Sequence, residues 1–284
     1  MKVFQFLGAD QGFDSRTCPS LSLAPIRPSS QVEAAELCHS DTHVLHGRGA
    51  AWMCALPVVL GHEVAGTIVK LSDSELTSTP FRVGDRVAVA CVGHPIQKRN
   101  FQEALGVGCD GGYAEYVAAP LGNLAKLPDA VGPAEAAVAT DSIVMSGYHG
   151  LGGQGLNGVA IAALRGAKVY GVDISTTKFD QARDAGAIEC ATSLDHFSDQ
   201  SFDVIVDFAG AQATVGAALS TVRNGGTVVL GGLASATVQF TTTDLVTKNI
   251  SLRGSKSANT REFREMVELL ASGALKPQIE EVQY

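Results

Sequence analysis

From Gly150 onward the sequence alternates short apolar runs with segments long enough to form a helix. The apolar runs are Gly166–Ser175, Phe202–Gly210, Gly225–Ser235 and Asn249–Ser255. Such alternation predicts an α/β, doubly wound parallel sheet in which crossover helices connect the strands. A further helix is expected from Thr260, with a stop at Gly273. One face of this helix carries the apolar residues Phe263, Met266, Val267 and Leu270.

The glycines at the start of this region have a spacing that is typical of nucleotide-binding turns. Gly150, Gly152 and Gly155 form a G-x-G-x-x-G pattern before an apolar run of helical length. Asp173 ends the next predicted strand, where a carboxylate binds the adenosine ribose and repels a 2′-phosphate, so the pattern favours NAD over NADP. Because the chain has 31 glycines, matches to this pattern also arise by chance. The alternative is a doubly wound fold that binds no nucleotide in its crevice.

The first part of the chain, up to about residue 130, has a different pattern of short β-like runs separated by turn residues. These runs are Val58–Leu71, Phe81–Val92 and Gly111–Pro120. They predict a small antiparallel β domain over residues 1–130, followed by the dinucleotide-binding domain over residues 131–284.

The charge, the hydropathy and the cysteines of the chain limit its partners and its cellular compartment. The net charge of −8 argues against nucleic acid, and the sequence has no apolar run of the roughly 20 residues that a membrane-spanning helix needs. Six cysteines without the spacing of a disulfide framework predict a reducing compartment, and we expect a cytoplasmic protein.

A cysteine and a histidine in the first domain are candidate metal ligands. Zn²⁺ binds both the thiolate of Cys38 and the imidazole of His62, and a catalytic zinc uses three protein ligands with one open position. Asp41 could accept a hydrogen bond from the far nitrogen of His62, and Ser40 could relay a proton. On these residues alone, a buried structural cysteine and a hydrogen-bonded histidine remain the alternative.

Five segments occur in the order found in one enzyme family. They are LCHSD, GHEVAGTIVKL, FRVGDRVAV, DGGYAEYV and GLGGQG. In these segments, and over nearly its whole length, the chain resembles the medium-chain zinc-dependent alcohol dehydrogenases. The resemblance implies a chaperonin-10-like β domain with a catalytic zinc and a Rossmann-type domain that binds NAD. It also implies hydride transfer between NAD(H) and an alcohol, aldehyde or ketone, and it is compatible with a homo-oligomer.

The resemblance implies a role for individual residues in the metal site. Cys38 and His62 match the family's zinc ligands, and Glu63 matches a residue near or on the metal. The third ligand is matched by Asp141. The small-molecule alcohol or carbonyl substrate would bind at the open position.

Three further residues match positions that serve the proton and the cofactor. Ser40 matches the hydroxyl that relays the substrate proton, and His43 matches the outer member of that relay. His39 stands where the family often places a cation near the cofactor pyrophosphate.

The sequence also departs from the family. Only Cys91 and Cys109 stand where many relatives hold a structural zinc with four closely spaced cysteines, so we expect that site to be lost. The strand before Cys38 looks mostly missing, and Glu36 replaces a common glycine. The interval from Asp141 to Gly150 is too short for both the zinc-bearing helix and the first strand of the nucleotide domain, and the chain ends early.

These departures predict a nucleotide domain with fewer than six parallel strands and a shortened chain with weak dehydrogenase activity. One alternative is a degenerate, non-catalytic member of the family that retains zinc or nucleotide binding. Another is a zinc-free enoyl or quinone-type reductase of the same superfamily, against which the pair of Cys38 and His62 argues.

Overall fold

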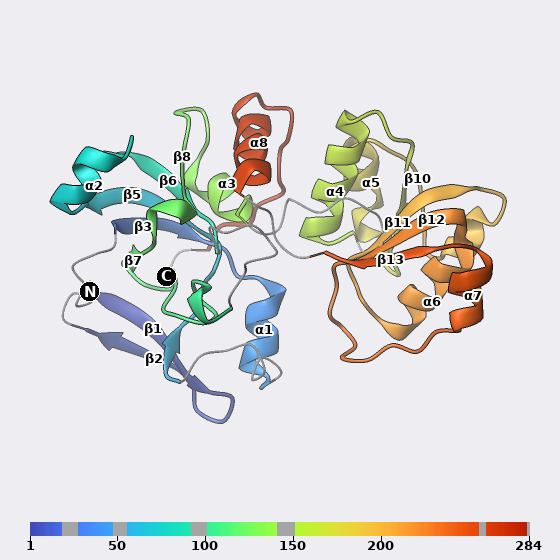
Figure 1. The fold of residues 1–284 in the computed structure, drawn as a ribbon, viewed down its shortest axis with the longest axis horizontal. Helices are drawn as coiled ribbons and strands as arrows, with labels where there is room; N and C mark the ends of the chain where they lie inside the picture. The colour runs from blue at the N-terminus through green and yellow to red at the C-terminus, as the bar shows by residue number, and fades with distance from the viewer. Residues whose placement is uncertain (19–27, 48–55, 92–100, 141–150, 256–259, 283–284) are drawn as a thin grey trace. The chain divides into compact units, whose positions relative to one another are not determined.

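The computed structural model describes residues 1–18, 28–47, 56–91, 101–140, 151–255 and 260–282 (Figure 1). The chain divides into two compact units. Unit 1 consists of Met1–Ser142, Ala258–Ala274 and Ile279–Tyr284, and unit 2 of Ile143–Ser257 and Leu275–Gln278. Among the described residues, no helix is long and apolar enough to span a membrane.

Unit 1 contains two antiparallel sheets, as the sequence predicts. One has the order β2-β1-β4 and the other the order β7-β3-β5-β6-β8. Their strands are β1 (Lys2–Gly8), β2 (Gly12–Thr17), β3 (Ser29–Ala35), β4 (Val58–Val59), β5 (Val64–Lys70), β6 (Arg86–Val89), β7 (Tyr116–Ala118) and β8 (Leu124–Lys126). The apolar residues of the larger sheet, among them Val64, Ile68 and Val87, form one buried cluster.

The expectation that the strand before Cys38 is mostly missing is wrong. Strand β3 has seven residues and pairs with β5 on one edge and with β7 on the other. Its sequence, SSQVEAA, contains a single β-branched apolar residue, Val32, and its register with β5 shifts twice. Pairing on both edges therefore compensates for a weak local preference.

Unit 1 also holds several short helices and one long one. They are α1 (His39–Leu45), α2 (Asp73–Ser78), α3 (Pro133–Val138), α8 (Thr260–Ala271) and the 3₁₀ turns at Phe101–Glu103 and Leu121–Asn123. Helix α8 has the predicted buried face, and the chain turns at Gly273 with a φ of 68°. The predicted division assigned α3 and α8 to the second domain. In the structure α8 contacts α3 and β8, because its apolar face is buried in unit 1.

Unit 2 has the predicted alternation of strands and helices. Its strands are β9 (Val169–Val172), β10 (Ala187–Ala191), β11 (Phe202–Asp207), β12 (Val222–Leu230) and β13 (Ser251–Gly254). Its helices are α4 (Gly153–Leu164), α5 (Phe179–Asp184), α6 (Gln212–Thr221) and α7 (Thr242–Thr247), with 3₁₀ turns at Thr176–Lys178 and Leu194–Phe197.

The strands described in unit 2 form two parallel ladders, β10-β9 and β11-β12-β13. This order matches the two flanks of the 3-2-1-4-5-6 sheet that is typical of dinucleotide-binding domains. The segment Ile143–Tyr148, on which the prediction of a missing first strand rests, lies outside the described residues.

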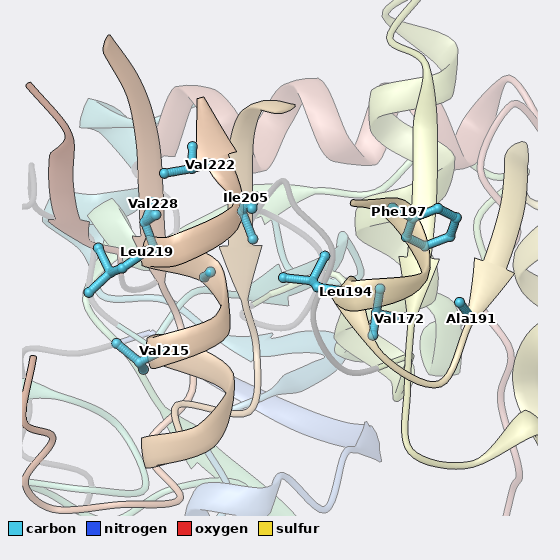
Figure 2. Close-up of a cluster of buried hydrophobic side chains, with 10 residues drawn as sticks. Val172, Ala191, Leu194, Phe197, Ile205, Val215, Leu219, Val222 and Val228 are labelled. Atoms are coloured by element: carbon cyan, nitrogen blue, oxygen red, sulfur yellow. The ribbon is translucent and has the colours of Figure 1, made fainter. Parts of the chain in front are cut away.

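A shared core joins the two ladders. Val172 and Ala191 come from the first ladder, whereas Ile205 and Val228 come from the second, and all four belong to one buried cluster with residues of α6 (Figure 2). A second cluster packs α4 and α5 against β9 and β10. The two ladders therefore belong to one layered α/β unit.

Candidate metal centre and nucleotide turn

Three potential metal ligands converge in unit 1. The ligand atoms of Cys38, His62 and Glu63 all lie within 4.8 Å of one another, and all three residues are buried. A thiolate, an imidazole and a carboxylate are all good ligands for Zn²⁺. The short separations fit shared ligation of one ion by side chains that are 24 and 25 positions apart in sequence.

The pairing of β3 with β5 explains why these residues meet. The two strands are antiparallel, and Ala35 at the end of β3 pairs with Val64 at the start of β5. The residues that follow β3 therefore lie beside the residues that precede β5. The Glu36 N–H extends this pairing, because it donates to the Glu63 carbonyl at 2.9 Å.

Asp41 connects both arms of this group. It stands in the first turn of α1, and its Oδ2 accepts the Cys38 N–H at 3.1 Å. Its Oδ1 lies 3.5 Å from His62 Nδ1, and both side chains are buried. This contact favours the tautomer with the proton on Nδ1, which leaves Nε2 to bind a metal. The geometry agrees with the supporting role expected of Asp41.

Ser40 lies directly at the candidate ligands. Its hydroxyl is 3.1 Å from Cys38 Sγ and 3.2 Å from His62 Nε2. His43 lies three residues further along α1, on the same side of the helix and half-buried. His39 begins α1, but its side chain is outside the described part of the structure, as are all atoms of Asp141.

The buried site holds its protons tightly when no metal is present. Burial disfavours the imidazolium of His62, but hydrogen bonds and charges from Asp41 and Cys38 outweigh it and raise the pKa of His62 well above its usual value. Burial, the Glu36 carboxyl group and the charge of Cys38 raise the pKa of Glu63 well above its usual value. A cation would have to displace these protons.

Two residues of this centre escaped the sequence analysis as functional residues. The Tyr113 hydroxyl lies 2.8 Å from Asp41 Oδ2 and 3.0 Å from the Glu36 carbonyl oxygen. The Glu36 carboxyl group interacts with that of Glu63. For Glu36, the sequence signal was that it replaces a glycine common in the family. For Tyr113 the sequence offered no such signal, because the residue lies in a segment with the pattern of a strand.

Cys91 and Cys109, which remain in the segment of the family's structural zinc, are not part of a cluster of potential metal ligands among the described residues. Cys91 is buried and its Sγ lies 3.6 Å from the Leu105 carbonyl oxygen. Cys109 is half-buried beside the carbonyl oxygens of Glu103 and Ala104.

In unit 2 the glycine turn leads directly into α4. Gly152 is the residue before the helix, and Gly155 lies in its first turn. The N–H groups of a first turn have no partner within the helix and favour anions such as phosphate. Gly150 lies outside the described residues.

Asp173 follows β9 at once and reaches this turn. Its Oδ2 accepts the Leu151 N–H at 2.7 Å and its Oδ1 accepts the Ser175 N–H at 2.9 Å. The structure thus brings Asp173 beside the glycine turn, as a dinucleotide site requires.

Comparisons with known proteins give a match for the β domain and a match for the dinucleotide-binding domain. Residues 31–129 match the alcohol dehydrogenase GroES-like domain, and residues 153–272 match the zinc-binding dehydrogenase family. An alcohol dehydrogenase of Geobacillus stearothermophilus is 29% identical over 288 aligned positions, which cover 88% of this chain and 82% of the relative. Because 88% of a 284-residue chain is fewer than 288 residues, this alignment has gaps within the present chain.

A fungal relative and a solved structure extend the likeness. A probable D-xylulose reductase A of Aspergillus clavatus is 27% identical, over 92% of this chain and 83% of the relative. The structure of acetophenone reductase from Geotrichum candidum in complex with NAD has a TM-score of 0.85 and 30% identity, and the match covers 98% of this chain and 89% of that one. With its GroES-like domain and its Rossmann-type domain, the chain belongs to the medium-chain zinc alcohol dehydrogenase family of oxidoreductases.

Proposed function

We propose that the protein is a zinc- and NAD-dependent oxidoreductase that acts on a small alcohol, aldehyde or ketone. The observation that carries the proposal is the buried group of Cys38, His62 and Glu63. Its mixed set of sulfur, nitrogen and oxygen donors fits Zn²⁺ and leaves room for a substrate. Asp141 is the expected further ligand.

The chain's own residues would each contribute a defined step. Bound zinc would supply Lewis acidity toward the substrate oxygen, and bound NAD would accept or donate the hydride. Ser40 would take the substrate proton at Oγ, which lies within hydrogen-bond distance of two ligand atoms, and pass it toward His43. Asp41 would hold the His62 ring in the tautomer that exposes Nε2.

In unit 2 the first turn of α4 would hold the cofactor pyrophosphate, with Gly150, Gly152 and Gly155 allowing close approach of the backbone. Asp173 would bind the adenosine ribose. A cytoplasmic location is part of the proposal, because the spacing of the six cysteines does not have the pattern of a disulfide framework.

Metal analysis combined with NADH turnover on the purified protein tests the proposal. We expect at most about one zinc per chain, because the cysteine cluster of a second site is lost. Two tightly held zinc ions would contradict our interpretation of the segment around Cys91 and Cys109. A protein without zinc that still reduces an activated alkene would instead be a zinc-free reductase.

A second candidate is a non-catalytic member of the family that retains metal or nucleotide binding. The gaps within the alignment favour it, because the Geobacillus relative has residues there that this chain lacks. The same experiment separates the two candidates, since the non-catalytic protein would bind zinc or NADH and turn over no substrate.

A further inference from the structure

Tyr113 links the segments that carry the candidate metal ligands. The side chain is buried, with 9% of its surface exposed, and its hydroxyl reaches both Asp41 and the Glu36 carbonyl. We propose that Tyr113 is a positioning residue of the metal centre, whose hydroxyl fixes the Asp41 carboxylate against His62. This inference rests on the proposed metal site.

The hydrogen-bond geometry gives the Tyr113 hydroxyl a preferred partner. A tyrosine has one O–H to donate, and a carboxylate is a stronger acceptor than a carbonyl. The distance to Asp41 Oδ2, 2.8 Å, is also shorter than the 3.0 Å to the Glu36 oxygen. We therefore assign the proton mainly to the bond with Asp41.

With that bond in place, the Asp41 carboxylate has little freedom to rotate. Oδ2 accepts from two donors, the Tyr113 hydroxyl and the Cys38 N–H, which come from different segments. Oδ1 is consequently held on the side of His62 Nδ1. Without the hydroxyl, the backbone N–H of Cys38 would remain as the donor to Oδ2, and a single donor leaves the carboxylate free to turn about it.

The position of Tyr113 is itself fixed by the segment that carries His62. Its N–H donates to the Leu60 carbonyl at 2.9 Å, and its ring lies against Gly61. A Cβ at Gly61 would come within 2.7 Å of that ring, and Gly61 also has a left-handed φ of 91°. Tyr113 therefore holds Asp41 in register with His62, because one side chain touches both segments.

The Tyr113→Phe variant removes the hydroxyl and keeps the ring. We would measure Co²⁺ affinity by competition with a chelator and record the absorption bands of the cobalt–thiolate centre. Loss of a residue that supports a metal ligand typically costs about 10–100-fold in metal affinity, and we expect Y113F to weaken Co²⁺ binding by about tenfold. Its cobalt absorption bands should shift as well, because the His62 ring is held less firmly.

Tyr116→Phe is the matched control, since it removes a tyrosine hydroxyl from β7, three residues away, without touching Asp41. We expect Y116F to retain wild-type Co²⁺ affinity and spectrum. Equal Co²⁺ affinity and identical spectra for Y113F and wild type would overturn the inference. An equal loss in Y116F would overturn it too, because the effect would then belong to the sheet.

A double-mutant cycle with Asp41→Asn tests the route of the effect. If Tyr113 acts through Asp41, Y113F should weaken Co²⁺ binding much less in the D41N background than in the wild type. The same loss in both backgrounds would contradict the proposal. If wild-type protein and Cys38→Ser bind Co²⁺ equally, the proposed metal site itself fails, and this result is distinct from a silent Y113F.

Discussion

The candidate metal centre in unit 1 and the glycine turn in unit 2 are held in different ways. At the candidate metal centre, side chains from three segments meet: Asp41 accepts from the Tyr113 hydroxyl and from the Cys38 backbone N–H, and it faces His62. At the turn, backbone N–H groups would bind the phosphates, and the Leu151 N–H donates a hydrogen bond to Asp173 that ties the turn to the end of β9. The candidate metal centre is thus built mainly from side chains, and the glycine turn from backbone N–H groups.

This difference predicts how each site responds to a shortened chain. A network of side chains keeps its geometry as long as its own segments stay paired, and β3 and β5 are paired along their length. A turn that binds phosphate through its amides depends on the strand and helix on both sides of it. We therefore expect metal binding to survive better than nucleotide binding.

The largest effect is expected at the metal centre itself. Cys38→Ser removes the thiolate and should weaken zinc binding by more than about a hundredfold, the upper end for residues that merely support a ligand. Measured by metal analysis after dialysis, the variant should lose its zinc. Cys109→Ser, which removes a thiol outside the group, should keep it. A C38S protein that retains zinc would show that the metal lies elsewhere.

The second effect concerns the nucleotide. If the turn lacks a preceding strand, its residues must be ordered on binding at a cost of about 1–2 kcal/mol each, and every 1.4 kcal/mol is about a tenfold loss. We expect the NADH affinity, measured by calorimetry, to be orders of magnitude lower than that of a turn that is ordered before binding. Dehydrogenase activity should be weak or undetectable.

Two results would reverse this expectation. One is micromolar NAD binding with normal turnover by the 284-residue protein. The other is an experimental structure with an ordered strand across Ile143–Tyr148, paired on both sides. Either result would make the two sites equally well formed and remove the contrast between them.

The sequence predicted the members of the metal group better than their support. Cys38, His62 and Glu63 stand in the short motifs LCHSD and GHEVAG, whose residue types indicate metal binding. Tyr113 is 72 positions from Asp41, and its role depends on the folding of residues 59–61 against residues 111–113. Such a contact leaves no local pattern, because apolar-polar alternation explains a tyrosine in a strand segment just as well.

The fold, too, could be predicted from the sequence only where the local pattern is strong. Strands β9, β11, β12 and β13 are confirmed because their apolar runs are bounded by turn residues, whereas β10 (Ala187–Ala191) is not among the predicted runs. The stretch before Cys38 looks short against the family, and SSQVEAA has little β preference, yet the neighbours of β3 on both edges supply the pairing. Local propensity is a weak guide where tertiary contacts determine the structure.

A third, smaller effect is the pH dependence of the metal centre. The raised pKa values of His62 and Glu63 mean that the metal-free folded protein binds more protons than the unfolded chain, so their contribution to its stability falls as pH rises. Zinc must displace those protons, so its affinity should fall as pH falls, by about tenfold per pH unit for each proton. Competition titrations at several pH values measure this, and a flat profile would contradict it.

The smallest effect is expected at Asp173, where charge and hydrogen bonding can be separated. Asp173→Asn keeps an oxygen acceptor for the Leu151 N–H and removes the charge that repels a 2′-phosphate. We expect the wild type to prefer NADH over NADPH, and the variant to narrow that preference by about tenfold or less, which is roughly 1.4 kcal/mol. Asp184→Asn removes an exposed charge from α5 and should leave the preference unchanged.

Asp173→Ala completes the comparison, because it removes the acceptor as well as the charge. If the bond to Leu151 holds the glycine turn, D173A should weaken NADH and NADPH together, whereas D173N should mainly change their ratio. A wild-type protein that binds NADPH more tightly would refute the assignment of Asp173 to the ribose. Equal NADH affinity in D173N and D173A would mean that backbone contacts alone hold the turn.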